Sequence, residues 1–89
     1  MKSYLKNFLD EEGRVKQWPA KRVAQLEVIE YIANKFPEGS QFSEAELNEE
    51  IKKLHTFGDW AILRREMCDL GYFERDRNGT AYLRVMRAS

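Results

Sequence analysis

The sequence predicts a small α+β domain, mostly helical, in which three helices lead to a C-terminal β-hairpin and a short extra helix precedes them. Two helix starts carry their own capping residues, Ser43 and Asp59, and only "HTFG" joins the helices that they begin. The pair Asn78-Gly79 is the preferred two-residue turn of a β-hairpin, because both residues tolerate positive φ. The 89 residues allow one modest hydrophobic core, so we expect a single domain over residues 1–89.

Residues 1–18 are predicted to form a short N-terminal helix and an extended segment, attached to a core over residues 19–89. The apolar side chains of "SYLKNFLD" fall on one stripe of a helix. Trp18 is expected to be extended because it precedes a proline, and Pro19 suits the first turn of a helix.

Apolar periodicity predicts the first core helix, from Ala20 to Phe36. Its apolar residues recur at steps of three and four, and we expect them to face the core. The predicted stripe consists of Val23, Leu26, Ile29, Ile32 or Ala33, and Phe36.

Side-chain caps predict the second and third core helices. Ser43 caps a helix that runs to about Leu54, and Glu46 is placed to bond back to the Ser43 amide as a capping box. Asp59 caps the next helix, "WAILRREMCDL", and Gly71 follows it where a left-handed backbone ends a helix. A Gly-containing connection as short as "HTFG" is typical of a helix-turn-helix.

The C-terminal hairpin has a predicted register and two predicted faces. Its turn places Arg75 opposite Tyr82, and alternation separates the side chains into two sets. One side carries Tyr72, Leu83 and Val85. The other, which we expect to face outward, carries Arg75, Arg77, Tyr82 and Arg84. Helices, turn and hairpin in this order predict a winged helix-turn-helix.

Four phrases of the sequence resemble, in order, a known family: "FLDEEGRVKQWP", "FSEAELN", "FGDWAILRREM" and "GYFERDRNGTAYLR". Over nearly its whole length the chain is similar to the domain-of-unknown-function family 2087. The resemblance implies a winged-helix-like module of bacterial proteins, alone or fused behind a helix-turn-helix domain of a transcription factor, and it brings no known catalytic or binding residues. The motif positions would be Trp18, Pro19, Glu44, Glu46, Asn48, Asp59, Arg64, Arg65, Gly71, Arg75 and Tyr82. Leu83 stands where the family often has a second aromatic residue, which weakens a stacking role for this strand.

Composition argues against several classes of function. The 15 basic and 15 acidic side chains give a formal net charge of zero, whereas a dedicated nucleic-acid binder usually carries a basic excess. A single cysteine, Cys68, excludes an internal disulfide and a structural zinc site. There is no signal-peptide pattern and no apolar stretch of about 18 residues. We therefore expect a cytoplasmic, soluble protein that needs no cofactor or metal.

The stretch "HTFGD" does not favour catalysis. His55 ends one helix, and the orphan amides of the next helix need the Asp59 carboxylate. Cys68 would lie roughly 13 Å further along that helix, at about 1.5 Å per residue. We therefore expect no enzyme, but a helix-end histidine and a capping aspartate.

The third core helix is expected to bury Trp60, Leu63, Met67 and Leu70. On its outer face, Arg65 is the one plausible reader of DNA bases, and Asp69 one turn on opposes it. The alternative for Arg64 and Arg65 is a bond to a carboxylate of the preceding helix, at Glu46 or Glu50.

Two basic clusters are candidate contacts to a phosphate backbone. On the outer side of the hairpin, the candidates are Arg75, Arg77 and Arg84 around Tyr82. Near the N-terminus, they are Arg14, Lys16, Lys21 and Arg22 around Trp18. The alternatives are a solvated ribbon for the hairpin and core packing for Trp18.

Two functions remain open for a non-catalytic domain of bacterial transcription-regulator type. In the first, it binds double-stranded DNA through the hairpin, the N-terminal basic cluster and Arg65. In the second, an apolar face contacts protein, either a second copy in a homodimer or another regulator. Ile62 is apolar on the outer face of the third helix, so we expect a partner copy or the N-terminal segment, with Tyr4 and Phe8, to cover it.

Overall fold

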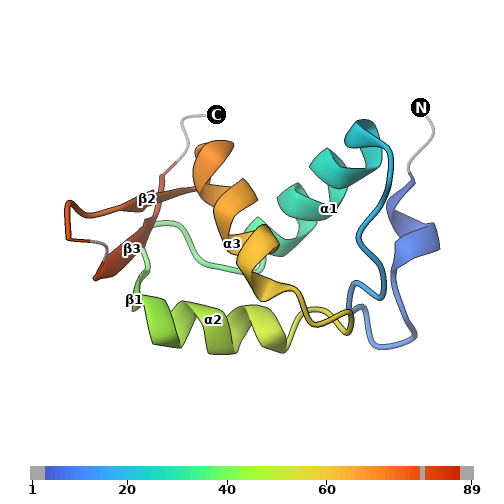
Figure 1. Cartoon of the computed structure of the whole chain (residues 1–89), viewed down its shortest axis with the longest axis horizontal. Helices are drawn as coiled ribbons and strands as arrows, with labels where there is room; N and C mark the ends of the chain where they lie inside the picture. The colour runs from blue at the N-terminus through green and yellow to red at the C-terminus, as the bar shows by residue number, and fades with distance from the viewer. Residues whose placement is uncertain (1–3, 79, 87–89) are drawn as a thin grey trace.

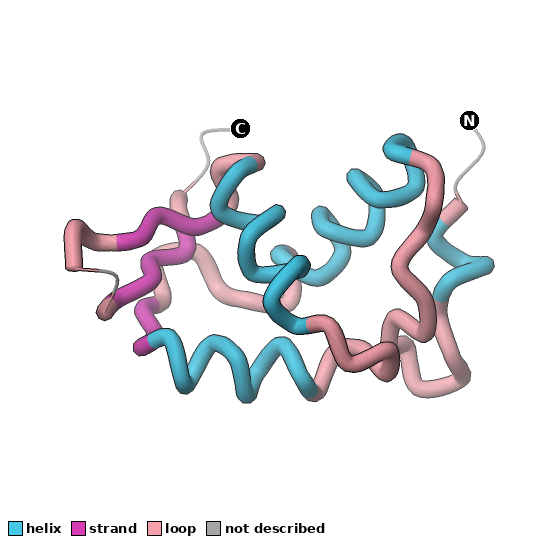
Figure 2. Tube along the Cα trace, in the orientation of Figure 1, coloured by secondary structure: helices cyan, strands magenta, loops and turns pink. Residues whose placement is uncertain are grey.

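The computed structural model describes residues 4–78 and 80–86 and shows an α+β fold (Figure 1). Its elements in chain order are the 3-10 helix η1 (Leu5–Phe8), α1 (Arg22–Ala33), β1 (Gln41–Ser43), α2 (Glu44–Lys52), α3 (Trp60–Asp69), β2 (Phe73–Arg75) and β3 (Ala81–Arg84). The strands form an antiparallel sheet in the order β1-β3-β2, at one end of the molecule (Figure 2). The predicted three helices and hairpin are confirmed, and β1 adds a strand that the sequence did not predict.

The predicted caps of α2 and α3 are confirmed. The Ser43 hydroxyl accepts the Glu46 amide at 3.1 Å, and the Glu46 carboxylate accepts the Ser43 amide at 2.8 Å, which completes the capping box. Asp59 accepts the Ile62 amide at 3.2 Å, and Gly71 follows α3 with a φ of 83°. Within residues 4–78 and 80–86, no helix combines the length and the apolar character that a membrane crossing requires.

The buried face of α1 differs from the predicted stripe. Val23 and Leu26 are 52% and 40% exposed. The buried residues of the helix are Ala24, Val28, Ile29, Ile32 and Ala33. Repeated steps of three lag behind the helical period of about 3.6 residues, so a stripe built on them rotates around the helix. Val23 and Ile32 therefore lie on opposite sides, and only the second half of the predicted stripe reaches the core.

The N-terminal segment is part of the core. Its predicted helix is only the single turn η1, which packs against α1. Val15 is fully buried and forms backbone bridges with Leu9 and His55. The Val15 amide donates to the Leu54 carbonyl at 2.9 Å, and the Val15 carbonyl accepts the Thr56 amide at 2.8 Å. The hydrophobic core therefore includes Val15, a residue of the segment predicted to precede the domain core.

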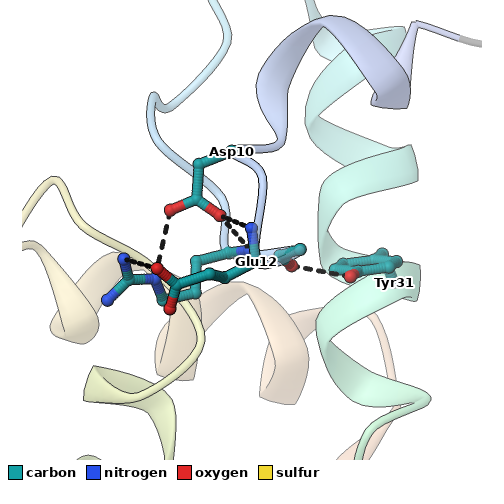
Figure 3. A network of polar contacts seen from close by, with 5 residues as sticks. Asp10, Glu12 and Tyr31 are labelled. Atoms are coloured by element: carbon teal, nitrogen blue, oxygen red, sulfur yellow. Dashed lines mark hydrogen bonds and ion pairs between the residues drawn. The ribbon is translucent and has the colours of Figure 1, made fainter.

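Asp10 holds a tight turn that follows η1 (Figure 3). Its carboxylate accepts the backbone amides of Glu12 at 2.9 Å and Arg14 at 2.8 Å. The bond from the Arg14 amide is the main cause that lowers the pKa of the Asp10 carboxyl. The Tyr31 hydroxyl of α1 donates to the Gly13 carbonyl at 2.6 Å and fixes the turn to the helix. Gly13 has a φ of 79°, which suits a residue without Cβ.

The hairpin has the predicted register, with Arg75 opposite Tyr82, but its two faces are exchanged. The prediction that Tyr82 and Arg84 face outward is wrong, since they are only 1% and 4% exposed. Their polar ends have partners within the chain: the Tyr82 hydroxyl donates to the exposed Glu44 at 2.9 Å, and the Arg84 Nε donates to the buried Ala33 carbonyl at 3.0 Å. The ring and the aliphatic stem can therefore fill the core while the polar tips stay satisfied.

Candidate nucleic-acid interface

A hollow of about 440 Å³ lies where α3 meets the hairpin. In Figure 1 the chain enters β2 directly from the C-terminal end of α3, so the two elements lie together. The α3 residues of the hollow are spaced so that they share the face opposite to the buried Leu63 and Met67. The lining residues are Ala61, Arg64, Arg65, Cys68, Asp69, Arg75 and Tyr82.

Three guanidinium groups border this hollow. The Arg64 side chain is half-buried and donates to the Asn48 side chain of α2, so its partner is an amide and not a carboxylate of that helix. Within the described part of the chain, neither Arg64 nor Arg65 nor Arg75 forms an ion pair with a carboxylate. Asp69 is the one acidic residue in the lining, and the Glu44 carboxylate lies beside the hollow at 2.9 Å from the Tyr82 hydroxyl. Positive charge thus exceeds negative charge around the hollow.

Tyr82 forms the part of the hollow that belongs to β3. Burial is the main cause that raises the pKa of its hydroxyl, and the hydrogen bond to Glu44 raises it further. The nearby guanidiniums of Arg75 and Arg64 act in the opposite direction. Tyr82 therefore remains protonated at neutral pH, and its hydroxyl links β3 to α2 through Glu44.

Residues that are far apart in the sequence, but that all belong to the phrases carrying the family resemblance, meet at this place. They come from α2, α3 and the hairpin. The residues are Glu44, Asn48, Arg64, Arg65, Arg75 and Tyr82.

The hairpin keeps two of its predicted contact residues at the surface. Arg75 and Arg77 are exposed, whereas Arg84 is buried and cannot reach a partner molecule. The Asp76 carboxylate between them accepts both the amide and the hydroxyl of Thr80 at 2.8 Å. The acid at the tip of the hairpin thus has local donors, and residue 79 of the predicted turn lies outside the described residues.

The N-terminal basic cluster lies at the end of the molecule opposite the hairpin (Figure 1). Arg14 pairs with two acidic residues of the turn that precedes it, and Arg22 pairs with Glu66 of α3 at 3.0 Å. Lys16 and Lys21 are exposed. The cluster and the hairpin therefore form two separate surfaces, and only the two lysines of the cluster lack a carboxylate partner among the described residues.

The residues predicted to cover an apolar outer face have other positions. Ile62 is half-buried and packs against the core of its own chain, so the expectation that it turns away from that core is wrong. η1 lies against α1, and Phe8 packs against the same core while Tyr4 is exposed. Trp18 is also half-buried against the core, which agrees with the core-packing alternative.

The structure shows an apolar patch that the sequence did not predict. Val23 and Leu26 of α1, both exposed, line a shallow hollow of about 420 Å³ together with Leu70 and Tyr72. Glu27 and Glu30 complete its lining. The sequence contained this signal for Val23, which a strict count of about 100° per residue places opposite the buried Ile32, but not for Leu26, which the same count places beside the buried Ala33.

His55 and Asp59 do not form a catalytic pair. His55 is buried, and its Nδ1 lies 2.8 Å from the Ile51 carbonyl, while the Asp59 carboxylate caps α3. The buried Nε2 of His55 has no hydrogen-bond partner in the described structure. In the same part of the chain, no group of three His, Cys, Asp or Glu residues is placed to hold a metal ion.

Cys68 provides a chemical probe of the hollow. Burial is the main cause that raises the pKa of its thiol, and Arg75 and Arg64 oppose this effect. Because the thiolate is the reactive form, we expect iodoacetamide at pH 8 to alkylate Cys68 more slowly in the folded than in the unfolded chain. Arg75→Gln should slow the reaction further, whereas Arg77→Gln should leave its rate unchanged. Mass-spectrometric time courses measure these rates, and faster alkylation of Arg75→Gln would contradict the prediction.

Residues 14–84 match the family described as "Uncharacterized protein conserved in bacteria (DUF2087)". No curated protein and no solved structure matches the chain. The matched range contains α1, α2, α3 and the three strands, together with every residue of the arginine-bordered hollow.

Proposed function

The chain belongs to the family DUF2087, and we propose that it is a non-catalytic winged-helix domain of bacterial transcription-regulator type that binds double-stranded DNA. The element order α1, β1, α2, α3, β2, β3 supports this proposal. In such a fold, α2 and α3 form a helix-turn-helix, α3 approaches the major groove, and the hairpin contacts the backbone beside it.

The observation that carries the proposal is a set of exposed arginines on α3 and the hairpin: Arg65, Arg75 and Arg77. None of them is paired with a carboxylate among the described residues. Binding to DNA draws on cations that can displace counterions from phosphates, so unpaired arginines matter more than the net charge of the chain. The formal net charge of zero is therefore compatible with a local basic surface.

Lysines compensate two of the four acidic residues of α2. Glu49 pairs with Lys52 and Glu50 with Lys53, both at 2.9 Å. Glu44 accepts the Tyr82 hydroxyl and Glu46 accepts the Ser43 amide, so these two carboxylates have neutral donors and keep their charge.

A salt-titrated binding experiment tests the proposal. The full chain is titrated into a labelled duplex of random sequence, and fluorescence anisotropy gives Kd between about 50 and 200 mM salt, where phosphate contacts have a strong effect. Arg75→Gln and Arg77→Gln should each weaken binding to all duplexes and lower the slope of log K against log salt by about one. Lys16→Gln removes the same charge at the opposite end of the molecule and should change the slope less.

The absence of duplex binding at about 50 mM salt would contradict the proposal. If Lys16→Gln and Arg75→Gln change the salt slope equally, duplex binding depends on the total charge of the chain and not on a defined surface. Circular dichroism spectra of the variants check that each remains folded.

A second function is favoured by the apolar patch formed by Val23, Leu26, Leu70 and Tyr72. Two exposed apolar side chains on one helix face suit a contact with a second copy of the chain or with another regulator. A sedimentation measurement that shows a dimer, in a chain that fails to bind duplex DNA, would favour this function over the first.

A further inference from the structure

We propose that the hollow between α3 and the hairpin is a binding site for one phosphate group, held by Arg64, Arg65 and Arg75. The inference rests on the proposed function where this phosphate belongs to a DNA backbone. It goes beyond that function where the phosphate belongs to a small phosphorylated molecule. The shared chemistry is a tetrahedral oxyanion that accepts hydrogen bonds from several guanidiniums.

The three guanidiniums of the lining favour a phosphate over a carboxylate. Three arginines and one aspartate, Asp69, border the hollow, and the Glu44 carboxylate lies beside it at 2.9 Å from the Tyr82 hydroxyl, so positive charge remains in excess. A phosphate monoester carries close to two negative charges at neutral pH and offers three acceptor oxygens. A carboxylate offers only two oxygens and a single negative charge.

A contact within the protein holds one of the guanidiniums before any ligand arrives. The Asn48 side chain on α2 accepts a hydrogen bond from Arg64, whose side chain is half-buried. A guanidinium that is already oriented loses less conformational freedom when it binds an anion.

Arg64 and Arg75 come from different elements but border the same hollow, which Cys68 and Tyr82 also line. One phosphate in this hollow can therefore receive hydrogen bonds from both guanidiniums. The hollow, at about 440 Å³, also leaves room for the remainder of a ligand beside the phosphate.

Nuclear magnetic resonance of the ¹⁵N-labelled full chain tests the site, with inorganic phosphate as the probe. Phosphate replaces sodium chloride at constant ionic strength, so non-specific screening stays the same. We expect the backbone amides of Arg65, Cys68, Asp69 and Arg75 to shift and to reach saturation. Shifts that remain linear in phosphate, or that chloride reproduces, would overturn the proposal.

Three variants distinguish a defined site from general attraction. Arg75→Gln should weaken phosphate binding about tenfold, the expected effect of losing charge-assisted hydrogen bonds. Arg77→Gln removes the same charge from an arginine outside the hollow and should change Kd less than about twofold. Asp69→Asn should strengthen binding by about twofold or more, because it removes the one negative charge of the lining. Equal responses of the Arg75 and Arg77 variants would contradict a defined site.

A competition between phosphate and a duplex identifies the source of the phosphate. If duplex DNA shifts the same amides and phosphate displaces it from them, the hollow receives the DNA backbone. If phosphate saturates the hollow while the duplex does not bind, the proposed DNA function fails and the site serves a small phosphorylated molecule. If the duplex binds but phosphate never saturates, DNA binding stands and the phosphate site is wrong.

Discussion

Replacing Arg84 with methionine is expected to lower the free energy of unfolding by about 3 kcal/mol. The Arg84 side chain donates from Nε to the Ala33 carbonyl at 3.0 Å and from Nη1 to the Val85 carbonyl at 2.9 Å. The Ala33 carbonyl belongs to the C-terminal turn of α1, where a cation is favourable to the helix dipole. Methionine fills a similar volume but donates no hydrogen bond, so both carbonyls lose a charged donor, and the Ala33 carbonyl keeps only the Phe36 amide at 3.1 Å. Urea denaturation followed by circular dichroism measures the change.

Two further variants separate the hydrogen bonds from the charge. Arg84→Lys keeps the cation without the planar fork and should give an intermediate loss. Arg77→Met, on the exposed tip of the hairpin, should change stability by less than about 0.5 kcal/mol. If Arg84→Met leaves the free energy of unfolding unchanged or raises it, the cost of removing the guanidinium from water exceeds the stabilisation from its hydrogen bonds.

The hairpin shows how far alternation predicts a β-structure. The Asn-Gly turn correctly places Arg75 opposite Tyr82, because register depends on local backbone geometry. Which face meets the core depends on partners that are distant in sequence. Tyr82 finds its acceptor 38 residues away, and Arg84 finds Ala33 at a separation of 51. A polar tip alone therefore does not indicate an exposed side chain.

The same distinction explains the rest of the fold. The caps of α2 and α3 involve residues only three positions apart, so they could be predicted from the sequence. β1 was not predicted, because its three residues pair only with Ala81, Tyr82 and Leu83 of β3, about 40 positions along the chain. The predicted outer face of α1 is wrong because the apolar pattern counts steps of three residues as full helical turns, whereas a turn takes about 3.6 residues.

The candidate site could be predicted only in its components. Arg65, Arg75 and Arg77 were correctly identified as exposed cations, and a tertiary partner for Arg64 was expected on the preceding helix. The hollow itself depends on the relative placement of α3 and the hairpin, which no local pattern contains. Asn48 had no feature in the sequence, beyond the family resemblance, that would mark it as the residue that holds Arg64.

The second large effect is expected for Phe73→Ala, which should lower the free energy of unfolding by about 3–5 kcal/mol. Phe73 is 2% exposed and packs edge-to-face on Phe36, with ring centroids 5.4 Å apart and an interplanar angle of 83°. The centroid of its ring also lies 6.3 Å from the ring centroid of Phe42 in β1. The three rings join the segment after α1 to two strands of the sheet, so this truncation opens a cavity at the base of the hairpin. Chemical denaturation again gives the measurement.

Phe42→Ala is the matched control, because Phe42 belongs to the same cluster but is only half-buried. It should cost clearly less than Phe73→Ala, and equal losses would contradict the assignment of Phe73 as the anchor of the hairpin. Phe73→Leu keeps most of the volume and should leave the chain folded at 25 °C. Since Arg75 lies two residues further along β2 on the same face, a loosened anchor should also weaken phosphate binding in Phe73→Leu. Phosphate affinity unchanged in that folded variant would show that the position of Arg75 does not depend on the packing of Phe73.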